Sequence, residues 1–370
     1  MDHGTIILKA VIAVTTDLGE TFYPQDLDLV ATVRALEDDG EIFLRRKVTW
    51  RAGSRSTHIA FDVSRQDVDW PACLHVKAKG FGKHSYGFLP PIADIWSQSL
   101  NPTRGIMDSG RLVERRFVSS ANRTVSLLEE AGDSIARHLW DGSQALTQYI
   151  DQTFAMETPS KLPLLEYALV SATYRRLNVL ELGCGCGTVG ISLAQAVPDC
   201  DVLLTDLPEV EELVHANIAR MNPAISSKVT FAPLDWEQDL PLSLQNRTND
   251  LIIVSECTYN TDTLRPLVST LLALTIRSPK AVIIVSTKTR HESEAAFFDM
   301  MRDAGLIEDG SLHFALPGCP GTGYADAATD VGLHVFRGRE HRLSLSPRGS
   351  DDSVPTRSKR ASSRRTNQAR

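Results

Sequence analysis

The amino-acid sequence predicts an α/β protein in which an open, largely parallel sheet follows a small β-rich N-terminal domain. A glycine-rich run at 181–190 lies between an apolar stretch and an amphipathic helix, so strand, turn and helix follow in order. Further apolar stretches after this run end in carboxylates. Before residue 80, apolar and polar positions alternate in short runs instead. A chain of 370 residues, 42% of them hydrophobic, is long enough to bury both cores.

The alternating runs predict an antiparallel β domain over residues 1–80. Turn residues such as Asp38-Asp39-Gly40 separate runs at 5–15, 28–36, 41–50, 57–63 and 73–78. No motif in this region indicates a site. We therefore interpret it as a packing or partner-binding module, with substrate recruitment as the alternative.

The composition changes twice more along the chain. Residues 81–110 are rich in Gly, Pro and Ser and predict a linker with short ordered pieces. Strand-like runs at 111–118 and 123–128 predict a hairpin laid against the second domain, which extends over 111–338. Residues 339–370 carry Ser, Arg and Pro without apolar periodicity, so we expect a disordered basic tail. Such a tail suits a nuclear signal, nucleic-acid binding or a solvated end without a dedicated role.

The run Glu181-Leu-Gly183-Cys-Gly185-Cys-Gly187-Thr-Val-Gly190 is typical of a turn that binds a nucleotide cofactor. Its glycines allow positive φ and close approach of a ligand, and the start of the next helix offers free N–H groups. The spacing of these glycines alone does not identify the cofactor. The last three glycines also fit the dinucleotide fingerprint, with Asp206 as the ribose ligand.

Polar groups follow the later strands of the predicted sheet. Stretches at 201–206, 228–236 and 250–259 end at Asp206, at Asp235-Trp236, and at Glu256 followed by Tyr259. The stretch at 177–182 precedes the glycine turn, strands at 281–287 and 333–336 complete the sheet, and helices are expected at 189–197, 210–218 and 295–301. Because the carboxyl ends of parallel strands meet at one edge, these groups should line a ligand crevice.

Together these motifs resemble the seven-β-strand protein-lysine methyltransferases of the methyltransferase-like 21 group. The resemblance rests on Glu181–Gly190, Thr205–Pro208, Leu234–Trp236, Glu256–Tyr259 and an upstream Arg-His-Leu-Trp140-Asp segment, and it covers residues 110 to 338. The Arg-His-Leu-Trp-Asp and Cys-Thr-Tyr-Asn runs look most like fungal-type elongation-factor methyltransferases. The resemblance implies a class I, Rossmann-like, seven-stranded domain that uses S-adenosylmethionine (SAM).

The resemblance also implies a set of cofactor-binding residues. Glu181 and the backbone of Gly183, Gly185 and Gly187 would face the methionine part of SAM, Asp206 the ribose and Asp235 the adenine edge. Trp140, Trp236 and Ser255 belong to the same implied set. Alternatives stay open for some of these, since Asp206 can cap a helix and both tryptophans can be core aromatics.

Glu256 and Tyr259 are the predicted catalytic residues. The family usually carries Asp at the first of these positions, so Glu256 places its charge one methylene farther out. A lysine amine with an ordinary pKa of about 10.4 must lose its proton before it attacks the methyl group. We expect Glu256 to capture and orient the ammonium, Tyr259 to add a ring face or hydroxyl, and the proton to reach water. A purely structural role for Glu256 is the alternative. His291 is a candidate for the substrate side, or a helix cap.

No metal site is predicted. Cys184-x-Cys186 lacks a second ligand pair, and small side chains suit a tight glycine turn. Six irregularly spaced cysteines suit a reducing compartment, so we expect the cytosol, with the nucleus as a second location. The apolar stretch 6–14 is too short for a membrane span, is interrupted by Lys9, and lacks a cleavage signal.

The predicted function is SAM-dependent methylation of a lysine side chain on a protein, with a translation elongation factor as the candidate substrate. A net charge of −7 argues against general binding of nucleic acid by the folded domains and suits a cationic acceptor. Two alternatives remain, a small-molecule N-methyltransferase and a non-catalytic SAM-binding module. Methylation of nucleic acid ranks lower, because Glu256-Cys-Thr-Tyr259 stands where an Asn-Pro-Pro-Tyr tetrapeptide would bind a flipped base.

Overall fold

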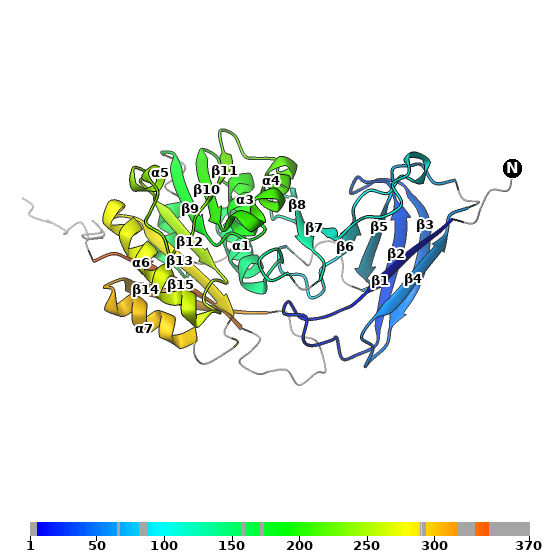
Figure 1. The fold of residues 1–370 in the computed structure, drawn as a ribbon, viewed down its shortest axis with the longest axis horizontal. Helices are drawn as coiled ribbons and strands as arrows, with labels where there is room; N and C mark the ends of the chain where they lie inside the picture. Colours follow the sequence, from blue (N-terminus) through cyan, green and yellow to red (C-terminus); the bar gives the residue numbers. More distant parts are fainter. Residues whose placement is uncertain are drawn as a thin grey trace, which may run out of the picture.

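A computed structural model gives the arrangement of the chain as two lobes side by side (Figure 1). It describes residues 6–64, 67–80, 87–132, 134–156, 160–170, 174–288, 290, 294–316 and 330–339. The predicted basic tail lies outside these residues from position 340 onward, and so does His291.

The larger lobe is built on a seven-stranded sheet whose strand order confirms the predicted class I fold. The order is β11-β10-β9-β12-β13-β15-β14. The first five strands in that order are parallel, and β15 runs antiparallel to both of its neighbours. Their bounds are β9 Leu177–Leu182, β10 Cys200–Asp206, β11 Lys228–Pro233, β12 Leu251–Ser255, β13 Val282–Lys288, β14 Ile307–Ala315 and β15 Asp330–Arg337. β9 lies where the strand order reverses, which is where such sheets open a ligand crevice.

Helices cover both faces of this sheet because its strands alternate apolar side chains between two cores. In β9, Leu177 and Val179 join the core formed with α1, α3 and α4, whereas Leu180 and Leu182 join the core formed with α6 and α7. The helices are α1 Asp141–Phe154, α2 Pro163–Val170, α3 Thr188–Ala196, α4 Glu211–Arg220, α5 Leu242–Gln245, α6 Thr261–Arg277 and α7 Ala295–Asp303.

The smaller lobe contains the β strands predicted before residue 80 together with three later strands. A six-stranded antiparallel sheet has the order β3-β2-β5-β6-β7-β8, and β1 pairs with β4 in a separate two-stranded sheet. The strands are β1 Ile7–Ile12, β2 Leu27–Arg34, β3 Ile42–Trp50, β4 Thr57–Asp62, β5 Cys73–Ala78, β6 Ile95–Ser97, β7 Leu112–Val118 and β8 Thr124–Glu130. Trp50 and Ile59 are almost fully buried in the core between the two sheets.

The β7–β8 hairpin belongs to both lobes. Its hydrogen bonds join it to the N-terminal sheet, because β7 pairs with β6 and β6 with β5. Its apolar side chains pack against the larger lobe, since Val125, Leu127 and Leu128 of β8 lie in the core of that lobe. The sequence placed this hairpin in the second domain, whereas the sheet runs across the 81–110 segment through β6. The domain boundaries therefore stay predictions.

Asn217 of α4 fixes the hairpin to the larger lobe. Its Oδ1 accepts a hydrogen bond from Leu128 N at 2.7 Å, and its Nδ2 donates to Leu128 O at 3.0 Å and to Cys186 O at 2.9 Å. The side chain is fully buried. One amide thus ties β8 to the helix and to the glycine turn.

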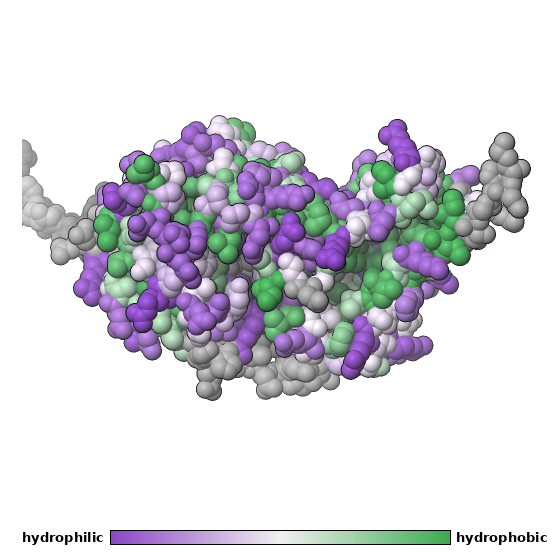
Figure 2. Space-filling model, in the orientation of Figure 1, coloured by the Kyte–Doolittle hydropathy of each residue, from purple (hydrophilic) through white to green (hydrophobic). Residues whose placement is uncertain are grey.

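The surface of this structure shows no broad apolar face on the side drawn in Figure 2, where charged and apolar residues are interspersed over both lobes. Among the described helices, none has both the length and the apolar composition needed to span a bilayer.

We expect Asn217→Ala to destabilise the protein by roughly 2 to 4 kcal/mol, because it leaves buried backbone groups of Leu128 and Cys186 without partners. Denaturant unfolding would measure the change. Asn222→Ala is the control, since Asn222 is exposed just beyond the same helix. Equal midpoints for the two variants would contradict this role of Asn217.

Candidate active site

The turn after β9, which we call the glycine cradle, consists of left-handed glycines packed tightly against neighbouring segments. Gly183, Gly185 and Gly187 have φ values of +63°, +52° and +77°, a region that favours glycine. A Cβ on Gly183 would lie 2.5 Å from Cys257 Sγ, and one on Gly185 would lie 3.0 Å from Ala136 O. The glycines are therefore required both by backbone conformation and by space.

Asp206 closes one side of this cradle, at the end of β10. Its Oδ2 accepts a hydrogen bond from Gly185 N at 2.8 Å, and its Oδ1 accepts one from Leu207 N at 2.7 Å. Burial raises its pKa, although these two bonds oppose the shift. Each oxygen keeps a further lone pair, so the carboxylate can still accept bonds from vicinal hydroxyls.

Glu181 lies beneath the turn. Its carboxyl is 1% exposed and its Oε2 accepts a hydrogen bond from Gly190 N at 2.8 Å, which ties β9 to the start of α3. Burial raises its pKa to about 8. The structure thus gives Glu181 a contact that shapes the cradle, and its predicted contact with the cofactor stays a prediction.

Asp235 and Trp236 follow β11 on the same edge of the sheet. Asp235 is half-buried, and its Oδ1 accepts a bond from Glu237 N at 2.9 Å. The ring of Trp236 would be 3.1 Å from a Cβ on Gly183, so it lines the cradle. Its indole Nε1 is buried and has no hydrogen-bond partner among the described residues. An orphaned donor beside the glycine turn fits a bound polar ligand.

Trp140 directly precedes α1, and Ser255 of β12 contacts the first turn of that helix. The indole of Trp140 donates to Ile135 O at 3.1 Å, and its segment covers the glycine turn through Ala136 O. Ser255, at the end of β12, is hydrogen-bonded to Ser143 Oγ at 3.0 Å. Their predicted contacts with the cofactor stay predictions.

Glu256 is buried beside the cradle in an unusual backbone conformation. Its φ is +58°, which costs a non-glycine residue on the order of 1 kcal/mol. Its Oε1 accepts a hydrogen bond from Gly142 N at the start of α1 (2.8 Å), and its Oε2 accepts one from Arg290 Nη1 (2.5 Å). Burial raises its pKa to about 7, although Arg290 opposes the shift. The amino end of a helix and a guanidinium thus stabilise its anionic form.

Sequence reasoning predicted Glu256 but missed the four charged residues around it, which together with Glu256 we call the charge cluster. It comprises Asp17, Asp141, Glu256, Lys288 and Arg290. Local signals existed for two members, because Asp141 follows Trp140 and Arg290 follows the fifth strand of the domain. No local signal marked Asp17, which comes from the N-terminal lobe.

Tyr259 lies on the short loop between β12 and α6. Its side chain is 56% exposed, and the next residue, Asn260, caps α6 by accepting from Asp262 N at 3.1 Å. Burial of part of the ring, together with nearby acids, raises its pKa. The hydroxyl is therefore protonated at neutral pH and stands at the mouth of the site.

The cysteines around the turn are buried thiols. Burial raises the pKa of Cys184, Cys186 and Cys257 well above its ordinary value, so they stay protonated. Within the part of the chain that the structure describes, no three His, Cys, Asp or Glu side chains are grouped to hold a metal ion.

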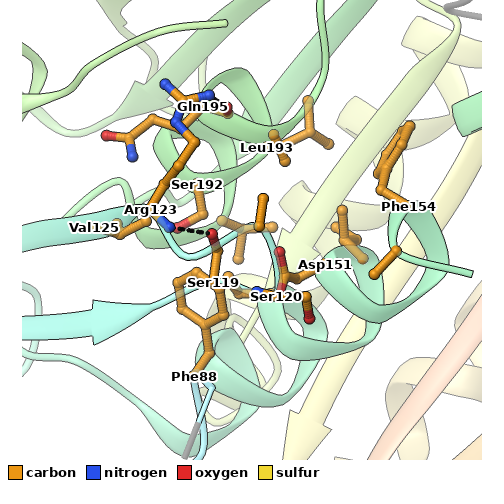
Figure 3. Close-up of a pocket in the computed structure, with 16 residues that line it drawn as sticks. Phe88, Ser119, Ser120, Arg123, Val125, Asp151, Phe154, Ser192, Leu193 and Gln195 are labelled. Carbon is orange, nitrogen blue, oxygen red and sulfur yellow. Dashed lines mark hydrogen bonds between the residues drawn. The ribbon is translucent and has the colours of Figure 1, made fainter. Parts of the chain in front are cut away.

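A second hollow, of about 470 Å³, lies between the β7–β8 hairpin, α1 and α3 (Figure 3). Ser119, Arg123, Asp151 and Gln195 line it. Its lining includes Val189 of α3 but none of Gly183, Gly185, Gly187, Asp206 and Glu256, so this hollow is distinct from the glycine cradle.

Comparison with known proteins shows that the chain is similar to lysine methyltransferases. The family model described as lysine methyltransferase matches residues 119–304. The protein N-lysine methyltransferase METTL21A of Xenopus tropicalis is 30% identical over 238 residues, which are 62% of this chain and 93% of that protein. A UPF0665 family protein of Schizosaccharomyces pombe is 27% identical over 78% of this chain and 85% of its own length. The mouse EEF1A lysine methyltransferase 3 is 27% identical over 56% of this chain and 74% of its own length.

We expect Asp206→Asn to weaken SAM binding roughly 10- to 100-fold, because hydrogen bonds to a charged group contribute about 1.5 to 3 kcal/mol. Calorimetric titration with SAM would measure this. Glu209→Gln is the matched control, since Glu209 is an exposed acid three residues away. Unchanged affinity in Asp206→Asn would remove Asp206 from the cofactor site.

Proposed function

The chain belongs to the lysine methyltransferase family, and we propose that its protein substrate is a translation elongation factor. It is a SAM-dependent protein-lysine N-methyltransferase. The proposal that the substrate is an elongation factor is supported by the mouse relative, which is named for EEF1A. The observation that carries the chemistry is the buried carboxylate of Glu256, held at the end of β12 beside the glycine cradle.

The residues of the cradle fit the methyl donor. Bound SAM supplies a methyl group on a positively charged sulfur, which makes that carbon electrophilic. Asp206 would hold the ribose hydroxyls, and the unpartnered indole of Trp236 lies beside Gly183 of the same turn. Asp235 would face the adenine. The protein's part is to align these groups rather than to activate a leaving group.

On the acceptor side, we assign Glu256 to capture the lysine ammonium. Each of its oxygens accepts one described hydrogen bond and keeps a second lone pair, so it can accept another from an N–H group. Tyr259 lies four-tenths buried at the mouth, where its ring or hydroxyl can contact the aliphatic stem. The amine then loses its proton to water. Its nitrogen lone pair forms the new N–C bond while the S–C electrons return to sulfur.

The remaining expectations follow from charge and redox state. The folded domains carry many acids in a chain of net charge −7, so we propose no nucleic-acid partner for them. All five described cysteines are free thiols, which supports the cytosol as the location, with the nucleus as a second one.

We expect Glu256→Gln to slow methyl transfer to lysate protein roughly 10- to 100-fold with little change in SAM affinity, because the variant keeps the shape but loses the charge. The carboxyl of the wild type gains a proton as the pH falls through about 7, so its rate should fall there, and the variant should lack this limb. Transfer of tritium from labelled SAM, measured against pH, tests both points.

Two further variants complete that experiment. Tyr259→Phe should also slow transfer more than it weakens SAM binding. Asp262→Asn is the control, since Asp262 is an exposed acid in the first turn of α6. Full turnover in both Glu256→Gln and Tyr259→Phe would show that the acceptor site lies elsewhere.

We expect purified elongation factor 1A from cells lacking this enzyme to accept label from tritiated SAM on lysine. The folded factor should be labelled far more than the heat-denatured factor, because alignment depends on a folded acceptor surface. Gel fluorography and peptide mass spectrometry would detect the product. A different labelled protein would overturn the elongation-factor assignment, and a low-mass product alone would favour small-molecule N-methylation.

A further inference from the structure

A hairpin from the smaller lobe reaches the charge cluster. Residues 14–23, which we call the N-terminal hairpin, follow β1 and are closed by Tyr23 N to Val14 O at 2.8 Å and Thr16 N to Thr21 O at 2.9 Å. Gly19 makes its turn with φ of +76°. In Figure 1 this dark blue segment leaves β1 and crosses toward the larger lobe. Its tip carries Asp17.

Asp17 is buried in spite of its place at a hairpin tip. Its side chain is 3% exposed, and its Oδ1 lies 2.9 Å from Lys288 Nζ. Its Oδ2 accepts from Arg290 Nη2 at 2.7 Å. Both partners are more than 270 residues away in sequence. A carboxylate at the tip of a hairpin is ordinarily exposed to solvent, and a buried one is ordinarily paired. The ion pairs of Asp17 with Lys288 and Arg290 are therefore part of the structure of the site.

The cluster is electrostatically interdependent. Three carboxylates face two cations, and Lys288 Nζ also contacts Asp141 Oδ2 at 2.7 Å. Burial opposes ionisation of Asp17, but Lys288 and Arg290 lower its pKa below the ordinary value. Asp17 is thus anionic and pairs with both cations at the carboxyl end of β13, whose last residue is Lys288.

Arg290 connects Asp17 to the acceptor site. One nitrogen of its guanidinium, Nη2, binds Asp17, and the other, Nη1, binds Glu256. A planar guanidinium held at both ends has a fixed orientation. If the Asp17 carboxylate is removed, Nη2 loses its ionic partner and the guanidinium can turn.

We propose that Asp17 of the N-terminal hairpin is a positioning residue for methyl transfer, acting through Arg290 on Glu256. The N-terminal lobe then completes the acceptor site of the larger lobe. This inference rests on the proposed role of Glu256 as the group that orients the acceptor lysine. It assigns a function to a region in which the sequence showed no site.

We expect Asp17→Asn to lower kcat for methylation of lysate protein roughly 10- to 100-fold while SAM affinity changes less than about twofold. The Asp17 charge also raises the pKa of Glu256, so its loss should move the rising limb of the rate toward lower pH. Tritium transfer from SAM in the full-length protein gives the rate, and calorimetry gives the affinity. Asp26→Asn is the control, because Asp26 pairs with Arg51 on the exposed face of the smaller lobe.

Asp17→Glu and Glu256→Gln make the outcomes distinguishable. Asp17→Glu keeps the charge and should retain more activity than Asp17→Asn, and equal loss in both would overturn the proposal. Normal kcat in Asp17→Asn with a slowed Glu256→Gln would also overturn it, while the role of Glu256 would stand. Normal kcat in Glu256→Gln would instead overturn the proposed role of Glu256. Circular dichroism would identify a variant that fails to fold, and Asp17→Glu then carries the test.

Discussion

The close approach of the backbone at the turn after β9 is the constraint on which the rest of the site depends. Three left-handed glycines bring this turn to the point where the sheet reverses its strand order. Gly185 N donates to Asp206, and Gly190 N donates to Glu181, so acids on two neighbouring strands fix the turn from both sides. A side chain at Gly183 would displace Cys257 and Trp236 together. Cofactor site and acceptor site are therefore parts of one packed edge.

The same edge joins the two lobes. Asn217 connects the glycine turn to β8, which continues the N-terminal sheet, and Asp17 of the N-terminal hairpin pairs with Lys288 and Arg290. Two separated attachments resist rotation far better than one linker does. The N-terminal lobe is thus held in a defined position relative to the crevice, and this position is what lets one of its residues influence a buried carboxylate in the other lobe.

The pattern of apolar and glycine residues was enough to predict most of the fold, because a strand buried on both faces and a glycine turn are each recognised from a few consecutive residues. The five alternating runs before residue 80 all became strands. β14 escaped prediction, since its side chains are mostly exposed or half-buried and give no apolar run. Glu256 could be placed at the end of β12, but its partners could not. Gly142 and Arg290 come from distant segments and meet at the Glu256 carboxylate only in the folded chain, as does Asp17 at Arg290.

The geometry also accounts for glutamate at position 256. The family pattern has the shorter aspartate there, and the left-handed conformation of Glu256 turns the chain sharply after β12. From that point, one carboxylate must reach both Gly142 N at the start of α1 and Arg290 beyond β13. The extra methylene supplies reach, and the helix amino end with the guanidinium opposes part of the desolvation that raises the pKa of Glu256. The two partners are needed for the proposed role of Glu256, because a carboxyl without partners at this depth would be protonated and unable to attract a cation.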